Sequence, residues 1–449
     1  MKKNILSIIL VIATWVLCNF TLSAHDLEVD GIYYNITSAY DNTVEVTYKG
    51  SSPTEVSDEY VGDITIPDNI EYDGIVYDVT SLGDSAFYQC KELTSTTIPE
   101  GITSIGNAAY QSCSTLSTVN FNPIRCTMGA YVFSQCKQLT TINIGLNVKS
   151  IPGGAFSTCT GLVEVTIPDN VVSLGNGAFS SCTSLQKLTI GNGITLIGRY
   201  AFKDCIALED VTLGNKITSL NSSAFENCTS LTSINIPDKV SNIGDNAFTN
   251  CSKLTEITIP NSVIEIGSYA FSECKSLNNI VIPKRITILQ MGTFKGCTSL
   301  SNITIPENII NIGNYTFANC VGLKEITSKA VNPPVISQGT FNNIDKTIPL
   351  YVPTNSVEAY QSATYWSEFS NISQDMTGIV GVDINNDVEI AIHNGRLSIS
   401  STNNKAVVRI YSLHGVLLHD TTGHHTVNIT LQQGIYLVQV NNTIRKVVL

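Results

Sequence analysis

The sequence predicts a solenoid of the α/β type that is mainly β, a stack of short coils with a parallel sheet, followed by a small all-β sandwich. Three observations predict it. A cysteine recurs every 23 residues, each cysteine has the same apolar neighbours, and a different, strand-like pattern begins near residue 382. Self-similarity at such a period is typical of stacked repeats.

The recurring cysteine defines the repeat. Leu lies three residues after every one of these cysteines, and Phe lies three residues before all but one of them, where Tyr110 stands instead. The same residue types in every copy indicate a structural ladder rather than one special site. The ladder consists of Cys90, Cys113, Cys136, Cys159, Cys182, Cys205, Cys228, Cys251, Cys274, Cys297 and Cys320.

Each repeat is predicted to contribute one strand to the sheet. The phrase L-x-x-I-x-I, as in "LTEITI", ends in the alternation of a half-buried strand. Pro follows it in six copies and should end the strand, because it lacks an N–H. Before the next cysteine, Gly usually follows an apolar residue, and we interpret this Gly as a bend with unusual backbone angles. One coil buries too little to fold alone, so the coils must stack.

The repeat gives way to other segments at both ends. Residues 80–330 are expected to form the eleven 23-residue coils of the solenoid. Residues 25–79 hold two similar phrases, "VDGIYYNIT" and "YDGIVYDVT", and are expected to form strands that cap the first coil. Residues 331–375 contain Pro333, Pro334 and several aromatic residues, and are expected to form a diverged last coil closed by a short helix.

The beginning of the chain has the pattern of a signal peptide over residues 1–24. Lys2 and Lys3 precede an apolar run from Ile5 to Leu17, and small residues precede a cleavage site near Ala24. No later segment approaches the roughly 18 uninterrupted apolar residues of a membrane span. The mature chain is therefore expected to be exported to an oxidising compartment and to have no membrane span.

Charge and histidine placement exclude several function classes. The chain has 25 basic and 37 acidic residues, a net charge of -12, which argues against nucleic acid as a partner. No histidine lies between residues 80 and 330, so a Ser-His-Asp or Cys-His site cannot form there. We expect no enzyme, no cofactor and no metal. The six histidines are His25, His393, His414, His419, His424 and His425, and nothing in the sequence fixes those of the tail on one face.

The ladder cysteines are predicted to be mostly buried thiols. Catalysis needs one special copy, and a thiolate zinc site needs four converging sulfurs. A disulfide needs a Cβ separation of about 3.5 to 4.5 Å, whereas equivalent side chains of stacked coils stay nearly one coil apart. We expect the thiols to fill a corner of the coil and to donate weakly to backbone carbonyls. Cys126 is off register, and a bond from it to a ladder cysteine stays open.

The repeat resembles the BspA-type leucine-rich repeat of bacterial surface proteins. The resemblance rests on L-x-x-I-x-I-P together with I-G-x-x-A-F-x-x-C, over roughly residues 60 to 372. It implies a right-handed leucine-rich-repeat coil stack in a secreted or surface protein. Several members of that family are adhesins for host matrix proteins or other bacteria.

The tail, residues 382–449, reads as short alternating strands separated by turns, which predicts the sandwich. It resembles the C-terminal sorting domain of Bacteroidetes type IX secretion cargo. The matching segments are "V-x-I-Y-x-L-x-G" at Val408 to Gly415, "G-I-Y-L-V-x-V" at Gly434 to Val440, and the basic and aliphatic end, Lys446 to Leu449. The resemblance implies recognition by the secretion machinery and a place on the outer surface of a Gram-negative bacterium.

The outward positions of the predicted strand are the candidate partner-binding face. The residue seven after each cysteine is mostly Thr, which we interpret as a strand-stabilising ladder. The residue five after each cysteine varies in charge. The candidates are Glu164, Lys187, Glu209, Asp210, Ser233, Glu256 and Asn279. Their acidic group could meet a basic protein patch or a divalent cation, while a solvated acidic face needs no ligand.

These observations predict a secreted or cell-surface, non-enzymatic, adhesin-like binding protein. It would present its leucine-rich-repeat sheet to a host or bacterial surface protein. The alternative is a structural surface-layer or spacer protein without a dedicated ligand. The predicted face lacks the aromatic platforms typical of sugar binding, which disfavours a lectin.

Overall fold

The structure is a computed structural model, and it describes most of residues 25–374 and the strands of the tail. The described ranges are 25–55, 59–121, 125–145, 147–374, 388–393, 396–401, 407–413, 415–422, 426–430, 435–440 and 443–448. The predicted signal peptide lies outside them. The chain divides into two compact units, the first running to Leu300 with residues 313–322 and 339–343, and the second holding residues 301–312, 323–338 and 344 onward.

The first unit is a stack of coils whose strands run parallel to one another. In this unit a strand follows seven of the ladder cysteines, and these strands are named here the front strands. They are β7 (Leu93–Ile98), β9 (Thr118–Phe121), β12 (Glu164–Ile167), β14 (Lys187–Ile190), β16 (Asp210–Thr212), β18 (Ser233–Asn235) and β20 (Glu256–Thr258). A further strand, β4 (Gly62–Thr65), precedes them and pairs with β7. Glu164 pairs with Lys187, and Lys187 pairs with Asp210, one repeat apart. The predicted mainly-β coil stack is confirmed.

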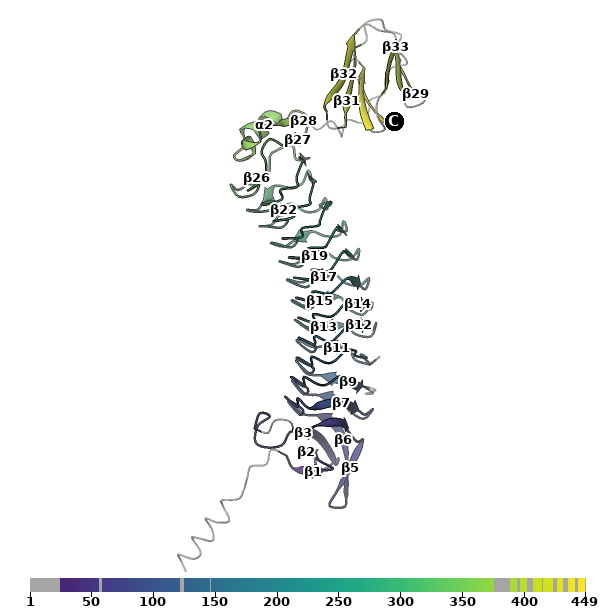
Figure 1. Cartoon of the computed structure of the whole chain (residues 1–449), viewed down its shortest axis with the longest axis vertical. Coiled ribbons are helices and arrows are strands. Elements are labelled where there is room, and N and C mark those ends of the chain that lie inside the picture. Colours follow the sequence, from purple (N-terminus) through teal and green to yellow (C-terminus); the bar gives the residue numbers. More distant parts are fainter. Residues whose placement is uncertain are drawn as a thin grey trace, which may run out of the picture. The chain divides into compact units, whose positions relative to one another are not determined.

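A second line of parallel strands, named here the back strands, was not predicted. They are β8 (Ser104–Ile105), β10 (Thr127–Met128), β11 (Ser150–Ile151), β13 (Ser173–Leu174), β15 (Leu196–Ile197), β17 (Ser219–Leu220), β19 (Asn242–Ile243), β21 (Glu265–Ile266) and β22 (Ile288–Leu289). The back strands β11, β13, β15, β17, β19 and β21 form one continuous sheet. In contrast, β4 and the front strands form three separate sheets. Figure 1 shows β12 and β14 on one side of the coils and β11, β13 and β15 on the other. A strand of two residues is too short for alternation to reveal it.

The interpretation of the repeated Gly as a bend with unusual angles was wrong. At Gly244 and Gly198 the φ angle is not positive, but an added Cβ would lie 2.6 Å from backbone atoms of the preceding coil. This Gly is therefore required by the close approach of two coil backbones. The left-handed turns lie elsewhere, five residues and one residue before the cysteine, where non-glycine residues such as Tyr200 and Asp204 have φ of 59° and 61°.

The centre of each coil holds one buried aromatic ring. From Phe87 to Phe341 these rings stack in a single file, with centroids 5.4 Å apart for Phe202 and Phe225, for example, and planes inclined by 13°. Offset stacking of this kind contributes about 0.5–1.5 kcal/mol per pair beyond the area buried. Each coil is thus stabilised chiefly by its two neighbours.

The N-terminal strands of the first unit form two hairpins and extend the back sheet. They are β1 (Leu27–Val29), β2 (Ile32–Ser38), β3 (Thr43–Thr47), β5 (Asn69–Tyr72) and β6 (Ile75–Leu82). The two similar phrases form the hairpins β1–β2 and β5–β6, each turning at an Asp-Gly pair with positive φ at both residues. The sheet order β1-β2-β3-β6-β8-β10 joins these strands to the back strands.

The second unit begins with four parallel strands and a short helix. The strands are β23 (Asn302–Ile305), β25 (Glu325–Ser328), β27 (Leu350–Val352) and β28 (Ile372–Gln374), beside the pair β24 (Asn311–Ile312) and β26 (Val335–Ile336). The helix α2 (Val357–Ser362) precedes a 3-10 turn, η1 (Trp366–Glu368). Tyr360 donates its hydroxyl to the Ala330 carbonyl, and Trp366 donates Nε1–H to the Pro334 carbonyl, both over 2.8 Å. These buried bonds fix the helix and the 3-10 turn against the segment between β25 and β26.

The tail consists of two antiparallel sheets, which confirms the small all-β unit. One has the order β29 (Val388–His393), β30 (Arg396–Ser401), β33 (Thr426–Thr430), and the other the order β32 (Leu417–Thr422), β31 (Val407–Ser412), β34 (Ile435–Val440), β35 (Thr443–Val448). In the part of the chain that the structure describes, no helix is long and apolar enough to cross a membrane.

Tyrosine occupies the left-handed position five residues before the cysteine in several coils, and Tyr131 and Tyr269 there cover the glycine at the same position of the next coil. An added Cβ at Gly154 would overlap the ring of Tyr131, and one at Gly292 would overlap the ring of Tyr269. Gly177 has the same left-handed φ, 62°, but an added Cβ would meet only the Ser180 Cβ at 3.8 Å. The two glycines therefore differ only in what covers them.

This difference predicts unequal costs for Gly154→Ala and Gly177→Ala. Gly177→Ala should cost about 1 kcal/mol, because alanine is strained at positive φ. Gly154→Ala should cost about 2–4 kcal/mol, because it also displaces the Tyr131 ring. Thermal unfolding followed by circular dichroism measures both. Adding Tyr131→Ala should reduce the cost of Gly154→Ala to that of Gly177→Ala, and equal costs with Tyr131 present would contradict the contact.

Candidate functional site

Three of the candidate residues lie side by side on the front strands. Glu164, Lys187 and Asp210 begin β12, β14 and β16, and all three side chains are exposed. Their strands are about 4.8 Å apart, as in any sheet. The Lys187 Nζ lies 3.1 Å from the Glu164 Oε1, and these side chains are 51% and 55% exposed. The structure thus brings opposite charges together in one row.

Glu209 adds a second exposed carboxylate next to Asp210. The backbone N–H groups of Glu209 and Asp210 both donate to the Gln186 carbonyl, over 2.9 and 3.1 Å, which fixes the backbone that carries them. We name Glu164, Lys187, Glu209 and Asp210 the acidic strip. An exposed ion pair contributes only about 0–1 kcal/mol, so a partner can replace the Lys187–Glu164 pair at little cost.

The remaining candidates form a separate group, named here the polar strip: Ser233, Glu256 and Asn279. Ser233 and Glu256 pair across β18 and β20, and both are exposed. Asn279 is exposed as well, but residues 277–282 of its coil form no strand. Among the described residues the front sheets are also interrupted between β16 and β18. The face predicted as one sheet is therefore two short strips.

Two exposed apolar side chains on the front of the coils were missed as binding residues. Val281 is 72% exposed and stands in the row that is otherwise Thr or Asn, and Val163 is 43% exposed beside Glu164. The repeated Thr and Asn residues of that row led to its interpretation as strand-stabilising. The signal that could have identified Val281 is its departure from the hydroxyl and amide residues of every other coil. A contiguous apolar patch with a polar rim is typical of a protein interface, and Val281 contributes one apolar group beside the polar strip.

The ladder cysteines connect each coil to the preceding one. From Cys113 to Cys320, each thiol donates to the carbonyl of the residue 26 positions earlier, over 2.9 to 3.3 Å. The acceptor is always the carbonyl of the stacked aromatic residue in the preceding coil, such as Phe225 for Cys251. The cysteine therefore satisfies a buried carbonyl that would otherwise cost free energy.

Burial suppresses the acidity of these thiols. It raises the pKa of Cys159 and of Cys274 to about 12, and it raises those of Cys182, Cys228 and Cys251 as well. The thiolate is the reactive form of cysteine, so little of it exists near neutral pH. This chemistry suits a structural group rather than a nucleophile.

Cys126 is a buried thiol in the structure, as are the other eleven cysteines of the described residues. Its Sγ lies 3.4 Å from the Thr127 carbonyl oxygen, and burial raises its pKa to about 12. Within the described ranges, no three His, Cys, Asp or Glu side chains are grouped to hold a metal ion. His414, His424 and His425 lie outside those ranges.

The raised pKa values predict that the native ladder resists alkylation. At pH 8 a thiol with a pKa of about 12, instead of 9.0, has about a thousandfold less thiolate, and burial also blocks access. Iodoacetamide should therefore modify the ladder only after unfolding, as measured by peptide mass mapping. The variant Thr212→Cys, at an exposed front position, should react in the native protein. Rapid native modification of Cys159 would contradict the burial.

Several solved structures are similar to this chain. A leucine-rich repeat protein from Bacteroides ovatus ATCC 8483 is 29% identical, with 68% of this chain and 94% of that chain covered and a TM-score of 0.40. A leucine rich cell surface protein from Faecalibacterium prausnitzii A2-165 is 27% identical, with 78% and 94% covered and a TM-score of 0.44. The pneumococcal vaccine antigen PcpA is 18% identical, with 78% and 96% covered and a TM-score of 0.43.

No functionally curated protein matches the chain. The family model described as the BspA type Leucine rich repeat region matches it at residues 80–206, 126–255 and 264–375. These residues include the whole cysteine ladder from Cys90 to Cys320 and exceed half of the chain. The protein therefore belongs to the BspA-type leucine-rich repeat family.

Proposed function

We propose that the protein is an exported, surface-displayed binding protein without catalysis, which presents its front strands to a protein partner. The observation that carries the proposal is the row of exposed, varying side chains on the paired strands β12, β14 and β16. The other repeated positions serve the architecture, as stacked rings, buried thiols or close-packed glycines. Membership of a family typical of bacterial surfaces supports the same function.

The chemistry of the strips favours a basic partner surface. The acidic strip has three carboxylates and one ammonium group, and the whole chain has a net charge of -12. The polar strip adds Glu256, and the exposed Val281 lies two residues from Asn279. A host or bacterial surface protein with lysine or arginine around an apolar group would complement both. Charge complementarity of this kind speeds association and selects the partner.

Reversing the front charges should therefore weaken binding. The front variant carries Glu164→Lys, Asp210→Lys and Glu256→Lys, and the control variant carries Glu100→Lys, Asp238→Lys and Glu307→Lys, which change the net charge equally at exposed positions outside the strands. The partner is first isolated from host matrix or bacterial surface extracts by cross-linking to the full protein. Its Kd should rise at least tenfold for the front variant only, and raised salt should weaken the wild-type complex.

Two results would contradict this function. One is an affinity that is the same for the front variant, the control variant and the wild type. The other is a wild-type protein that captures no partner from any extract, which would favour the structural spacer.

We also propose that residues 1–24 direct export and that residues 382–449 are a type IX sorting domain, which would place the protein on the outer surface of a Gram-negative bacterium. Two of the three segments that carry the resemblance overlap neighbouring strands, β31 and β34. Val408 pairs with Val440 and Ile410 pairs with Val438, and these four side chains are buried. Four of the resembling residues are thus core positions of one sheet, and β35, which includes Lys446, adds a further strand to that sheet.

Deleting residues 382–449 should abolish surface display. In a host with type IX secretion, the truncated protein should lose at least nine-tenths of its cell-surface signal and accumulate in the periplasm, because the machinery no longer recognises it. Protease accessibility on intact cells measures the display. Circular dichroism of the periplasmic protein shows whether the coils still fold. A truncated, folded protein that reaches the surface normally would contradict the sorting role.

A further inference from the structure

The two sheets of the coils end differently at the N-terminal side. The back sheet continues into β6, β3, β2 and β1, so the N-terminal hairpins cover its edge. The front sheet ends at β4, which pairs with β7 on one side. Among the described residues no strand pairs with the other side of β4. The two hairpins predicted as caps thus extend only the back sheet, and from the capping segment only β4 extends the front sheet.

The outer side of β4 presents backbone hydrogen-bonding groups. The N–H of Gly62 donates to the Glu92 carbonyl over 2.9 Å, and that of Ile66 donates to the Thr97 carbonyl over 3.1 Å, both toward β7. In a parallel ladder, alternate residues face opposite sides. Thr65, and Asp63 before it, therefore direct their backbone groups away from β7. Such an edge is a template for one more strand.

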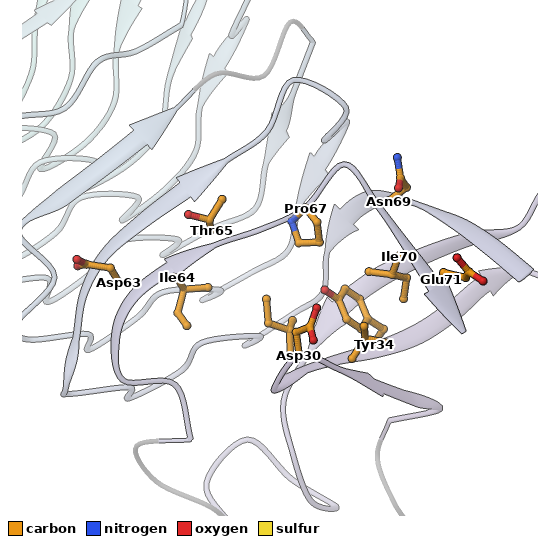
Figure 2. A pocket seen from close by; sticks show the side chains of 11 residues that line it. Asp30, Tyr34, Asp63, Ile64, Thr65, Pro67, Asn69, Ile70 and Glu71 are labelled. Carbon is orange, nitrogen blue, oxygen red and sulfur yellow. The ribbon is translucent and has the colours of Figure 1, made fainter. Parts of the chain in front are cut away.

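A hollow of about 610 Å³ lies beside this edge, between β4 and the two hairpins. Figure 2 shows Asp30 and Tyr34 between Ile64 of β4 and Ile70 of β5. Tyr34 and Ile70 are buried and form an apolar floor. The volume lies within the roughly 300–1,000 Å³ typical of ligand sites. An extended segment laid along β4 would thus find both backbone partners and space for its side chains.

The lining of the hollow is acidic. Asp30, Asp63 and Glu71 line it, and none of the residues that the structure places around it is lysine or arginine. Thr94 and Ser95 donate to the Asp63 carboxylate over 2.8 and 2.6 Å, and the bonds from Ser95 and Thr94 lower the pKa of that carboxyl and hold it in place. Pairing with a second copy of this edge would bring like charges together, which is unfavourable. The charges therefore favour a basic segment of another protein.

We propose that the free edge of β4 binds an extended, lysine- or arginine-bearing segment of another protein as an added strand. Its backbone pairs with Asp63 and Thr65, and its basic side chains lie near Asp30 and Glu71. This site contains no residue of the acidic or polar strip. It is therefore a second binding site, and it can be tested independently of the front face.

The test uses the full protein and a fluorescent, blocked octapeptide in which lysine alternates with valine and threonine. Thr65→Pro removes one outward N–H and is tolerated, since proline fits an edge strand whose N–H faces away from the ladder. It should weaken peptide binding at least tenfold in fluorescence anisotropy, with an unchanged melting temperature. Methylating alternate peptide amides should weaken binding equally, because it blocks the backbone pairing.

A second variant tests the charges. Asp30→Asn keeps a residue that tolerates the φ of 51° found there, and with Glu71→Gln it removes two carboxylates. This double variant should lower the affinity severalfold and flatten its salt dependence. The glutamate counterpart of the peptide should not bind. The front variant with its three lysines should bind the lysine peptide as the wild type does.

Three outcomes would overturn the proposal. The first is the absence of peptide binding to the wild type. The second is equal affinity for the methylated and unmethylated peptides, which would mean attraction by charge alone. The third is self-association of the wild type in sedimentation that Thr65→Pro abolishes, which would assign the edge to a second copy of this chain.

Discussion

The structure depends on the close, in-register approach of one coil backbone to the next. The back strands β11, β13, β15, β17, β19 and β21 and most front strands pair in register with their counterparts one repeat away, and glycines such as Gly244 leave no space for a Cβ between the coils. This approach makes every side chain the neighbour of its own counterpart. A residue type is therefore acceptable inside only when it packs well against a copy of itself, as phenylalanine and cysteine do.

The same constraint explains where variation occurs. Identical charges in one row would repel across about 4.8 Å, so the outward row alternates Glu164, Lys187 and Asp210 instead of repeating one residue. At the N-terminal end no further coil supplies a counterpart for β4, and backbone groups there remain available. Both binding sites proposed for this protein lie where a residue does not have to pack against its own counterpart. One is the outward row of the front strands, and the other is the free edge of β4.

The sequence predicted the coil stack because each cysteine, phenylalanine and leucine of the repeat packs against its counterpart in the next coil. The same residue types therefore recur every 23 positions. It did not predict the back strands, because two residues such as Ser150 and Ile151 carry no alternation. It also assigned the wrong reason to the repeated glycine, since close approach and positive φ select the same residue. The outward positions of the front strands follow from the repeat, but the interruption of the front sheets and the exposure of Val281 depend on backbone details that the repeat period does not contain.

The tyrosine that covers a glycine has a consequence for how such a chain can change its length. Losing or gaining a whole coil preserves the ring file and the thiol bonds, because each joins equivalent positions. The pairs Tyr131–Gly154 and Tyr269–Gly292 do not recur in every coil, because Tyr200 is followed one repeat later by Ser223, which also has a positive φ. Loss or gain of a coil beside such a pair gives the tyrosine ring a new neighbour. Coils of this repeat are therefore exchangeable only where the new neighbour leaves space for the ring.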